Sequence, residues 1–257
     1  MTYFTKNCTR CCDLELKEYG FKRKKGVYVR VVNDVVQCLE IEKLRSGREC
    51  RGMFSVLPLC MRLSEEYIFG VVYPRELRQF ETALGPQMLH SWELDPKSEE
   101  SVKDCVAEIV RHIRSYLIPF FERANCCETG LAEIVAVDKL FNENRISCLQ
   151  MNGMEDFSTP DAGLNLLDRA KYYMALKNGD YALAFECQSA LLNQNLIAHE
   201  KRRHYDFLPA ETLERDRLEI QRLQAELKRI EARDTEYFQR MIDENEAYSR
   251  ETLQKIL

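Results

Sequence analysis

The spacing of apolar side chains along the chain changes from a helical to a strand period after about twenty residues. In residues 4–19 apolar side chains recur every three or four positions, which predicts a helix that ends at Gly20. Residues 27–32 and 35–42 are rich in β-branched side chains and flank the turn pair Asn33-Asp34. They predict a β-hairpin.

Three later segments predict further strands. Residues 53–60 can return as a third strand, with Pro58 at an edge or a bulge because proline cannot donate to the ladder. Residues 67–73 and 88–94 are additional strand candidates. Together with the hairpin they predict an antiparallel meander.

Helical spacing returns after Pro96. Residues 98–123 and 128–142 predict two helices, the first kinked or restarted near Pro119. Helix breakers in residues 152–160 indicate a linker. We therefore expect an α+β fold, with an antiparallel meander sheet flanked by helices in residues 1–150 and an all-helical region in residues 160–257.

The helical region divides into a hairpin and a long tail. Residues 164–177 and 181–199 predict a helical hairpin around Asn178-Gly179-Asp180. Residues 210–257 contain no glycine or proline, so we expect one helix roughly 70 Å long at about 1.5 Å per residue. Its heptad stripe, interrupted by Asp234, predicts an interface formed by Ile220, Leu223, Leu227, Ile230, Tyr237 and Met241. The stripe can pack along the chain's own hairpin or form a homodimer, and the pattern favours neither.

Composition narrows the class of protein. The chain of 257 residues is 45% hydrophobic and 31% charged, with a net charge of −5 that is not segregated. Such a composition predicts a globular protein whose overall charge does not attract nucleic acid or membranes. The first residues lack the apolar run of a signal peptide, and no run approaches membrane-spanning length, so we expect a cytoplasmic location and no membrane partner.

Cysteine is abundant, and its spacing raises the question of a metal site. Cys8, Cys11 and Cys12 fall on one helical face, but a structural zinc site needs four ligands and no motif supplies the fourth. We expect the eleven cysteines to be reduced, mostly buried thiols, with no metal and no cofactor. The sequence also lacks a nucleophile, phosphate-loop or dinucleotide motif.

A basic cluster is the strongest chemical signal. In a meander the start of the first strand and the turn before the third can lie at the same end of the sheet. We therefore predict an anion-binding patch there, with Tyr28 as a stacking group. Charged turns more often serve to solvate a sheet end, and nucleic acid is the less expected ligand. The patch consists of Lys22, Arg23, Lys24, Lys25, Arg45, Arg48 and Arg51.

The N-terminal half resembles the bacterial domain-of-unknown-function family 4304. The resemblance rests on Tyr19-Gly20-Phe21-Lys22-Arg23-Lys24, on the strand ending Ile41-Glu42-Lys43, on Trp92, and on Leu117-Ile118-Pro119-Phe120-Phe121. It covers residues 1–133 and implies the helix, sheet and helix order described above. It implies no catalytic residues.

Two hypotheses about function follow. The first is a non-enzymatic protein-binding or regulatory module, immunity-like in character, that binds a protein partner or forms a homodimer through its C-terminal helix. The alternative is a small enzyme or a nucleotide- or nucleic-acid-binding protein that uses the basic end or the concave face of the sheet, with Tyr28 and Trp92.

Overall fold

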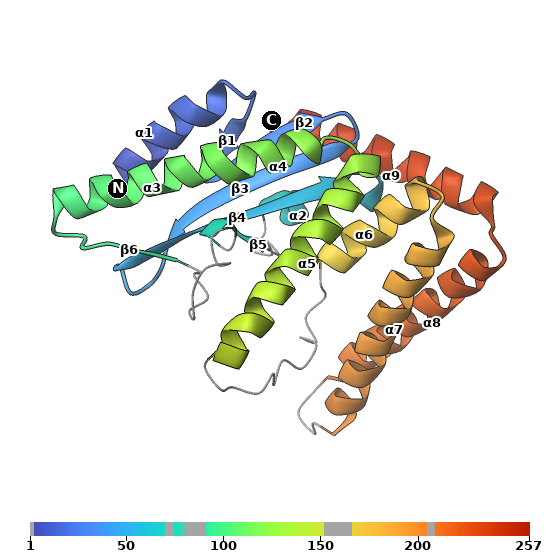
Figure 1. Ribbon diagram of the computed structural model, residues 1–257. Helices are drawn as coiled ribbons and strands as arrows, with labels where there is room; N and C mark the ends of the chain where they lie inside the picture. Colours follow the sequence, from blue (N-terminus) through green and yellow to red (C-terminus); the bar gives the residue numbers. More distant parts are fainter. Residues whose placement is uncertain (1–2, 70–74, 79, 81–90, 152–165, 205–208) are drawn as a thin grey trace.

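The computed structural model describes residues 3–69, 75–78, 80, 91–151, 166–204 and 209–257 (Figure 1). It confirms the α+β class, with an antiparallel sheet followed by a helical region. The elements of the sheet portion are α1 (Tyr3–Lys17), β1 (Lys22–Lys24), β2 (Val27–Val32), β3 (Val35–Lys43), β4 (Glu49–Pro58), η1 (Leu59–Met61), α2 (Glu65–Phe69), β5 (Arg75–Glu76), β6 (Trp92–Glu93), α3 (Glu99–His112), η3 (Ile113–Leu117) and α4 (Ile118–Arg123). The helices that follow are α5 (Cys127–Met151), α6 (Leu166–Lys177), α7 (Tyr181–Arg203), α8 (Ala210–Glu231) and α9 (Thr235–Ile256).

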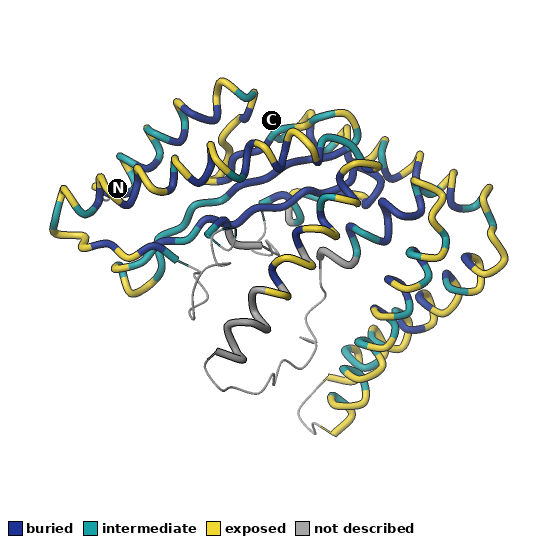
Figure 2. The backbone as a smooth tube through the Cα atoms, in the orientation of Figure 1, coloured by how far each residue is buried: buried dark blue, intermediate teal, exposed yellow. Residues whose placement is uncertain are grey.

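The sheet is the predicted meander. Its order is β1-β2-β3-β4-β5, with β6 also paired to β4, and neighbouring strands run antiparallel. The β2–β3 turn is the predicted pair Asn33-Asp34, and Asn33 has a φ of 50° that asparagine tolerates better than most residues. β3 and β4 form the centre, and Figure 2 shows them dark for most of their length because both faces are covered.

Helices cover both faces of the sheet. Figure 1 shows α1 and α3 side by side across one face, with α2 and α9 behind it. The buried amide of Gln37 on β3 donates to the carbonyls of Phe121 (2.7 Å) and Ala124 (3.0 Å), which satisfies the C-terminal end of α4. On the same face, the ring of Phe54 packs edge-on against Phe120.

The predicted irregularity near Pro119 is present. Between α3 and α4 the backbone forms a π-helical turn in which the Ile118 N–H donates to the Ile113 carbonyl. Pro119 lacks an N–H, so it sits at the start of α4, where a missing donor costs least. The π turn keeps the two helices continuous over the sheet.

The C-terminal segment is not one helix, contrary to the prediction. α8 ends in a Schellman-type cap, in which Asp234 N–H bonds to Arg229 O and Arg233 N–H bonds to Ile230 O, and Arg233 has a φ of 49°. Asp234 then starts α9 by accepting a hydrogen bond from the Tyr237 N–H at 3.2 Å. The Asp234 that interrupts the heptads is therefore a cap between two helices, and not a charge in a seam.

The stripe of predicted interface residues packs within the chain. Ile220, Leu223 and Ile230 are buried in α8, which lies against α7, whereas Leu227, Tyr237 and Met241 are partly buried against the core. This packing corresponds to the first of the two alternatives, a helix laid along its own hairpin. The break shifts the buried face of α9 by one position, to Phe238, Ile242, Asn245, Ser249 and Leu253.

A buried carboxylate ties α6, α7 and α8 together. Glu226 on α8 accepts hydrogen bonds from the Tyr172 hydroxyl (3.0 Å) and the Gln188 amide (2.6 Å), and it pairs with Arg222. Burial, followed by the Glu226 charge, raises the pKa of Tyr173 to about 12. Both carboxylate oxygens of Glu226 therefore have partners inside the bundle, as a buried charge requires.

Polar side chains of α9 hold the turn that follows β4. The Ser249 hydroxyl donates to Leu59 O and accepts from Leu63 N–H, both at 2.7 Å, and Asn245 donates to Cys60 O at 2.9 Å. One apolar core therefore includes residues from both predicted domains.

Some predictions are wrong or cannot be judged. Within the predicted strand 67–73, the described part belongs to the helix α2, because Ser64 caps its first turn. The rest of that strand, residues 88–90 and the predicted linker lie outside the described residues. The described part of the predicted strand 88–94 contains β6, which confirms that prediction in part. None of the helices in the described ranges combines the length and apolar character needed to cross a bilayer.

Candidate functional site

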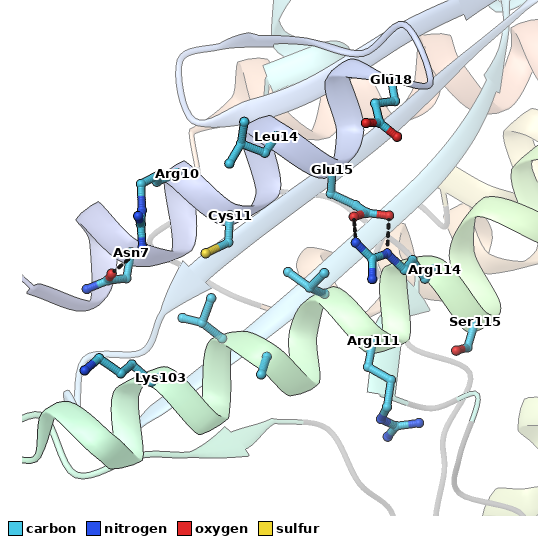
Figure 3. A pocket seen from close by; sticks show the side chains of 13 residues that line it. Asn7, Arg10, Cys11, Leu14, Glu15, Glu18, Lys103, Arg111, Arg114 and Ser115 are labelled. Atoms are coloured by element: carbon cyan, nitrogen blue, oxygen red, sulfur yellow. Dashed lines mark hydrogen bonds and ion pairs between the residues drawn. The ribbon is translucent and has the colours of Figure 1, made fainter.

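A groove of about 690 Å³ runs between α1 and α3 on the outer face of the helix layer. Figure 3 shows its length, from Asn7, Arg10 and Lys103 at one end to the Glu15–Arg114 pair at the other, with Cys11 between them. The lining residues are Asn7, Arg10, Cys11, Leu14, Glu15, Glu18, Lys103, Val106, Ala107, Val110, Arg111, Arg114 and Ser115.

Each helix carries two stripes, one facing the sheet and one lining the groove. In α1 the first stripe includes Cys8, Cys12 and Leu16, all buried, while Cys11 and Leu14 belong to the second. The spacing of three and four residues brings members of each stripe onto a common side of the helix. Leu14 is 68% exposed, although it is a large apolar residue beside other apolar groups. An apolar side chain in that position is available for a partner.

The same arrangement is found in α3. Val102, Cys105 and Ile109 are buried beneath the helix, whereas Ala107 and Val110 line the groove. Local sequence sets where α3 starts and where α1 ends. The Ser98 hydroxyl accepts from Ser101 N–H at 3.1 Å at the start of α3, and Gly20, with a φ of 80°, closes α1 as predicted.

Side-chain bridges join α1 to α3 and to η3 at two points along its length. The Tyr3 hydroxyl donates to Glu99 at 3.3 Å, and Arg114 Nε donates to the buried Glu15 carboxylate at 2.7 Å. The Glu15 hydrogen bond raises the pKa of Arg114, so the guanidinium stays charged. Tyr3 and Glu15 are twelve positions apart, which is roughly 18 Å of helix at about 1.5 Å per residue. The groove is therefore about as long as three helical turns.

The rim carries an excess of positive charge. Four basic residues, Arg10, Lys103, Arg111 and Arg114, face two acidic ones, Glu15 and Glu18. Arg111 and Arg114 already have carboxylate partners on the protein. Lys103 lies 3.9 Å from Glu99 in an exposed pair, and Arg10 makes a long contact of 3.4 Å with Asn7. Exposed contacts of this kind are weak, so Arg10 and Lys103 can instead bind an anionic group of a ligand.

The residues of the predicted anion patch are spread over separate parts of the sheet. β1 carries Lys22, Arg23 and Lys24 at one edge, with Lys25 in the turn that follows, and β2 and β3 separate this edge from Arg51 on β4. The first residue of β2, Val27, pairs with Glu40 of β3. β3 runs three residues further, to Lys43, and the turn that holds Arg45 and Arg48 comes after it. The strand order therefore places the two basic groups apart.

Three of these basic side chains are paired with carboxylates. Arg23 donates to Asp13 at 2.8 Å, Lys25 pairs with Glu65, and Arg51 pairs with Glu42. Arg48 lines a polar pocket of about 880 Å³ together with Glu49, Glu93, Asp95 and Lys97. Anion binding by the patch stays a prediction, and the neighbouring carboxylates would oppose it.

The two aromatic residues of the alternative hypothesis are buried. Tyr28 and Trp92 are each 4% exposed. The Tyr28 hydroxyl donates to Asp13 at 2.9 Å, and Trp92 packs edge-on against His112. Burial is the main reason that the pKa of Tyr28 lies above its ordinary value. Neither ring is available for stacking on a ligand, which corrects the expectation for Tyr28.

Sequence reasoning missed the groove because it sought one apolar face on each helix. The sequence holds only part of the signal: Cys11 and Leu14, like Val106 and Val110, repeat at helical spacing beside the sheet-facing stripe, but this repeat does not show that the two helices pair. In the described part of the chain, no three His, Cys, Asp or Glu side chains converge as metal ligands do.

No family model, curated protein or solved structure matches this chain. The resemblance of the N-terminal half to the bacterial family 4304 accordingly stays a prediction.

Proposed function

We propose that the protein is a non-enzymatic, cytoplasmic protein-binding module whose α1–α3 groove receives an amphipathic helix of a partner protein. The observation that carries the proposal is the exposed Leu14 beside the apolar lining of a groove on the surface. Exposed apolar surface with a polar rim is typical of a protein-interaction site.

The shape of the groove favours a helix as the occupant. Both walls are helices whose own N–H and C=O groups are used internally, so an extended peptide would find no strand edge there to pair with. A helix of about 12 residues spans roughly 18 Å and can place residues i, i+3, i+4 and i+7 on the apolar lining. The groove lining, from Asn7 to Glu18 on α1, fits an insert of that length.

The charge of the rim favours an acidic helix. Arg10 and Lys103 lie at the Tyr3 end, where carboxylates on the edge of the incoming helix can reach them. The chain as a whole is negatively charged, so this local excess of basic groups runs against the global balance. Complementary charge contributes mainly to the association rate and to the choice of partner, while Leu14 and its neighbours supply the affinity.

The C-terminal helices are the second candidate contact surface, for a homodimer or a protein partner. These helices expose less apolar surface than the heptad pattern predicts, because Ile220, Leu223 and Ile230 are buried within the chain. Leu218, 53% exposed on α8, remains a large apolar group there. Because Leu218 lies outside the groove, its substitution is a control for substitutions of Leu14.

Selection from a library of helical peptides of about 12 residues tests the proposal with a defined probe. We expect the full-length protein to enrich peptides with an apolar stripe and acidic flanks. Replacement of Leu14 by glutamate should weaken their binding about tenfold or more, since a buried leucine contributes about 1.5–3 kcal/mol. The matched change Leu218→Glu should leave the affinity unchanged.

Two results would refute the proposal. One is that enriched peptides bind the Leu14→Glu protein as well as the unchanged protein, while circular dichroism shows both to be folded. The other is that no helical peptide is enriched. Peptides lost in the Leu218→Glu protein and retained in the Leu14→Glu protein would assign binding to the C-terminal helices instead.

A further inference from the structure

A close pair of thiols lies beneath α3, on the side of the helix that faces the sheet. Cys50 Sγ on β4 and Cys105 Sγ on α3 are 3.3 Å apart, and both residues are buried. The two cysteines come from different elements that pack face to face, so the contact does not follow from chain proximity. A disulfide requires the sulfurs to approach to about 2.05 Å, which is a small movement from this starting distance.

The surroundings distinguish the two sulfurs. The hydrogen bond with Cys50 lowers the pKa of the Cys105 thiol and, with the nearby positive charge of Arg78, outweighs the opposing effect of burial. The same hydrogen bond and burial raise the pKa of Cys50. Cys105 is therefore the sulfur that loses its proton more readily, and the thiolate so formed is the reactive form of cysteine.

Arg78 is well placed to support this charge separation. Its guanidinium lies 5.9 Å from the ring of Trp92, the β6 residue that pairs with Cys50. Its Nη1 donates to Ser91 O, whereas its Nε is buried without a hydrogen-bond partner among the described residues. A partly buried cation with spare donor capacity at its buried Nε favours a nearby anion.

A second thiol pair on the same face of the sheet provides a comparison. Cys8 Sγ and Cys12 Sγ lie 3.9 Å apart on successive turns of α1. The hydrogen bond with Cys8 and burial raise the pKa of Cys12, and no cation is among the groups that shift it. The surroundings of Cys12 therefore disfavour its thiolate, unlike those of Cys105.

We propose that Cys50 and Cys105 are a redox-active pair that closes to a disulfide when hydrogen peroxide reaches it. The Cys105 thiolate attacks one peroxide oxygen and breaks the O–O bond, giving a sulfenic acid, and the released hydroxide takes up a proton to form water. The Cys50 sulfur then attacks the Cys105 sulfur, forms the S–S bond, loses its proton and expels the sulfenic oxygen as a second water. The two thiols lose two electrons, and the peroxide gains them.

Closure would join α3 covalently to β4 and so fix one wall of the groove to the sheet. The chemistry does not depend on what the groove binds. An internal link across this part of the chain restricts the unfolded state, so the oxidised protein should melt at a higher temperature than the reduced one.

Mass spectrometry of the full-length protein tests the proposal. The folded protein is treated with equimolar hydrogen peroxide, blocked with N-ethylmaleimide and digested with trypsin. We expect a linked pair of peptides, residues 49–51 and 104–111, and a loss of about 2 Da from the intact chain. The Cys50→Ser protein should instead accumulate a dimedone-reactive sulfenic acid at Cys105, and the Cys12→Ser protein should form the link normally.

The result that overturns the proposal is equally specific. It fails if the linked peptides are absent from the folded wild-type protein, or if they appear only after denaturation. It also fails if Cys8 and Cys12 are oxidised at the same rate, because the electrostatic distinction would then have no effect. The wild-type digest decides these outcomes even if a cysteine variant does not fold.

Discussion

Replacing Ser249 by alanine should destabilise the fold far more than its small size suggests. The Ser249 hydroxyl donates to Leu59 O and accepts from Leu63 N–H, and these three residues are fully buried. Alanine fits the helix well and leaves α9 intact. It removes the hydrogen-bond acceptor that Ser249 provides for the Leu63 N–H, and the shorter of two bonds to the Leu59 carbonyl. That carbonyl also receives a 3.4 Å contact from the Arg62 N–H.

The size of the effect follows from the two groups left behind. A buried donor or acceptor without a partner costs about 1–3 kcal/mol, and the carbonyl keeps part of its bonding through Arg62. We therefore expect a loss of about 2–4 kcal/mol. For a chain of this length that corresponds to a fall in melting temperature of roughly 5–12 °C.

Thermal melting followed by circular dichroism, together with urea unfolding, measures this loss. Gln254→Ala is the matched control, because Gln254 is an exposed residue of the same helix. It should melt at the temperature of the unchanged protein. If Ser249→Ala also does so, the hydroxyl does not hold the turn, and the reasoning that docks α9 there is refuted.

Three further predictions concern the caps, an ion pair and the basic patch. Arg233→Gly should stabilise the protein by about 0.5–1 kcal/mol, because glycine relieves the left-handed backbone, and Asp234→Ala should cost about 1 kcal/mol through loss of the α9 cap; urea unfolding compares their opposite signs. Burial favours a higher pKa for Asp34, but hydrogen bonds from Lys177 and Cys127 outweigh it and lower the pKa, so its stabilisation is present above the ordinary value of 3.8 and is lost as the pH falls through the lower folded-state value. Asp34→Asn should therefore cost about 1.5–3 kcal/mol at pH 7, and urea unfolding at acid pH should show the difference from the wild type disappearing. Replacing residues 22–25 by glutamine should abolish any polyanion binding, which should itself weaken steeply as salt rises in a titration; unchanged binding would exclude the patch.

Local signals in the sequence were sufficient wherever a residue type has one conformational role. Gly20 ends α1, the Asn33-Asp34 pair makes the hairpin turn, and Pro119 marks the irregular turn after α3. Ser64 followed by two acidic residues is a helix start of the same kind, and its helix was missed because the apolar run after it looked like a strand.

The groove could not be predicted because it depends on how two distant helices are placed. Leu14 and Val110 are ordinary apolar positions until α1 and α3 lie side by side, and the pairing is set by the sheet beneath them. The ion pairs of Arg23 with Asp13 and of Lys25 with Glu65 likewise join residues whose meeting requires the fold. A run of basic residues in the sequence gave no sign of these carboxylates.

The C-terminal stripe shows how a correct period can indicate the wrong partner. A heptad pattern read through Asp234 continues to Tyr237 and Met241, but the left-handed turn at Arg233 shifts the buried face to Phe238 and Ile242. The shifted face also carries two polar residues, Asn245 and Ser249, which no apolar pattern selects. They are buried because they provide hydrogen-bond partners for the backbone of the turn after β4, and these bonds hold α9 against its own chain.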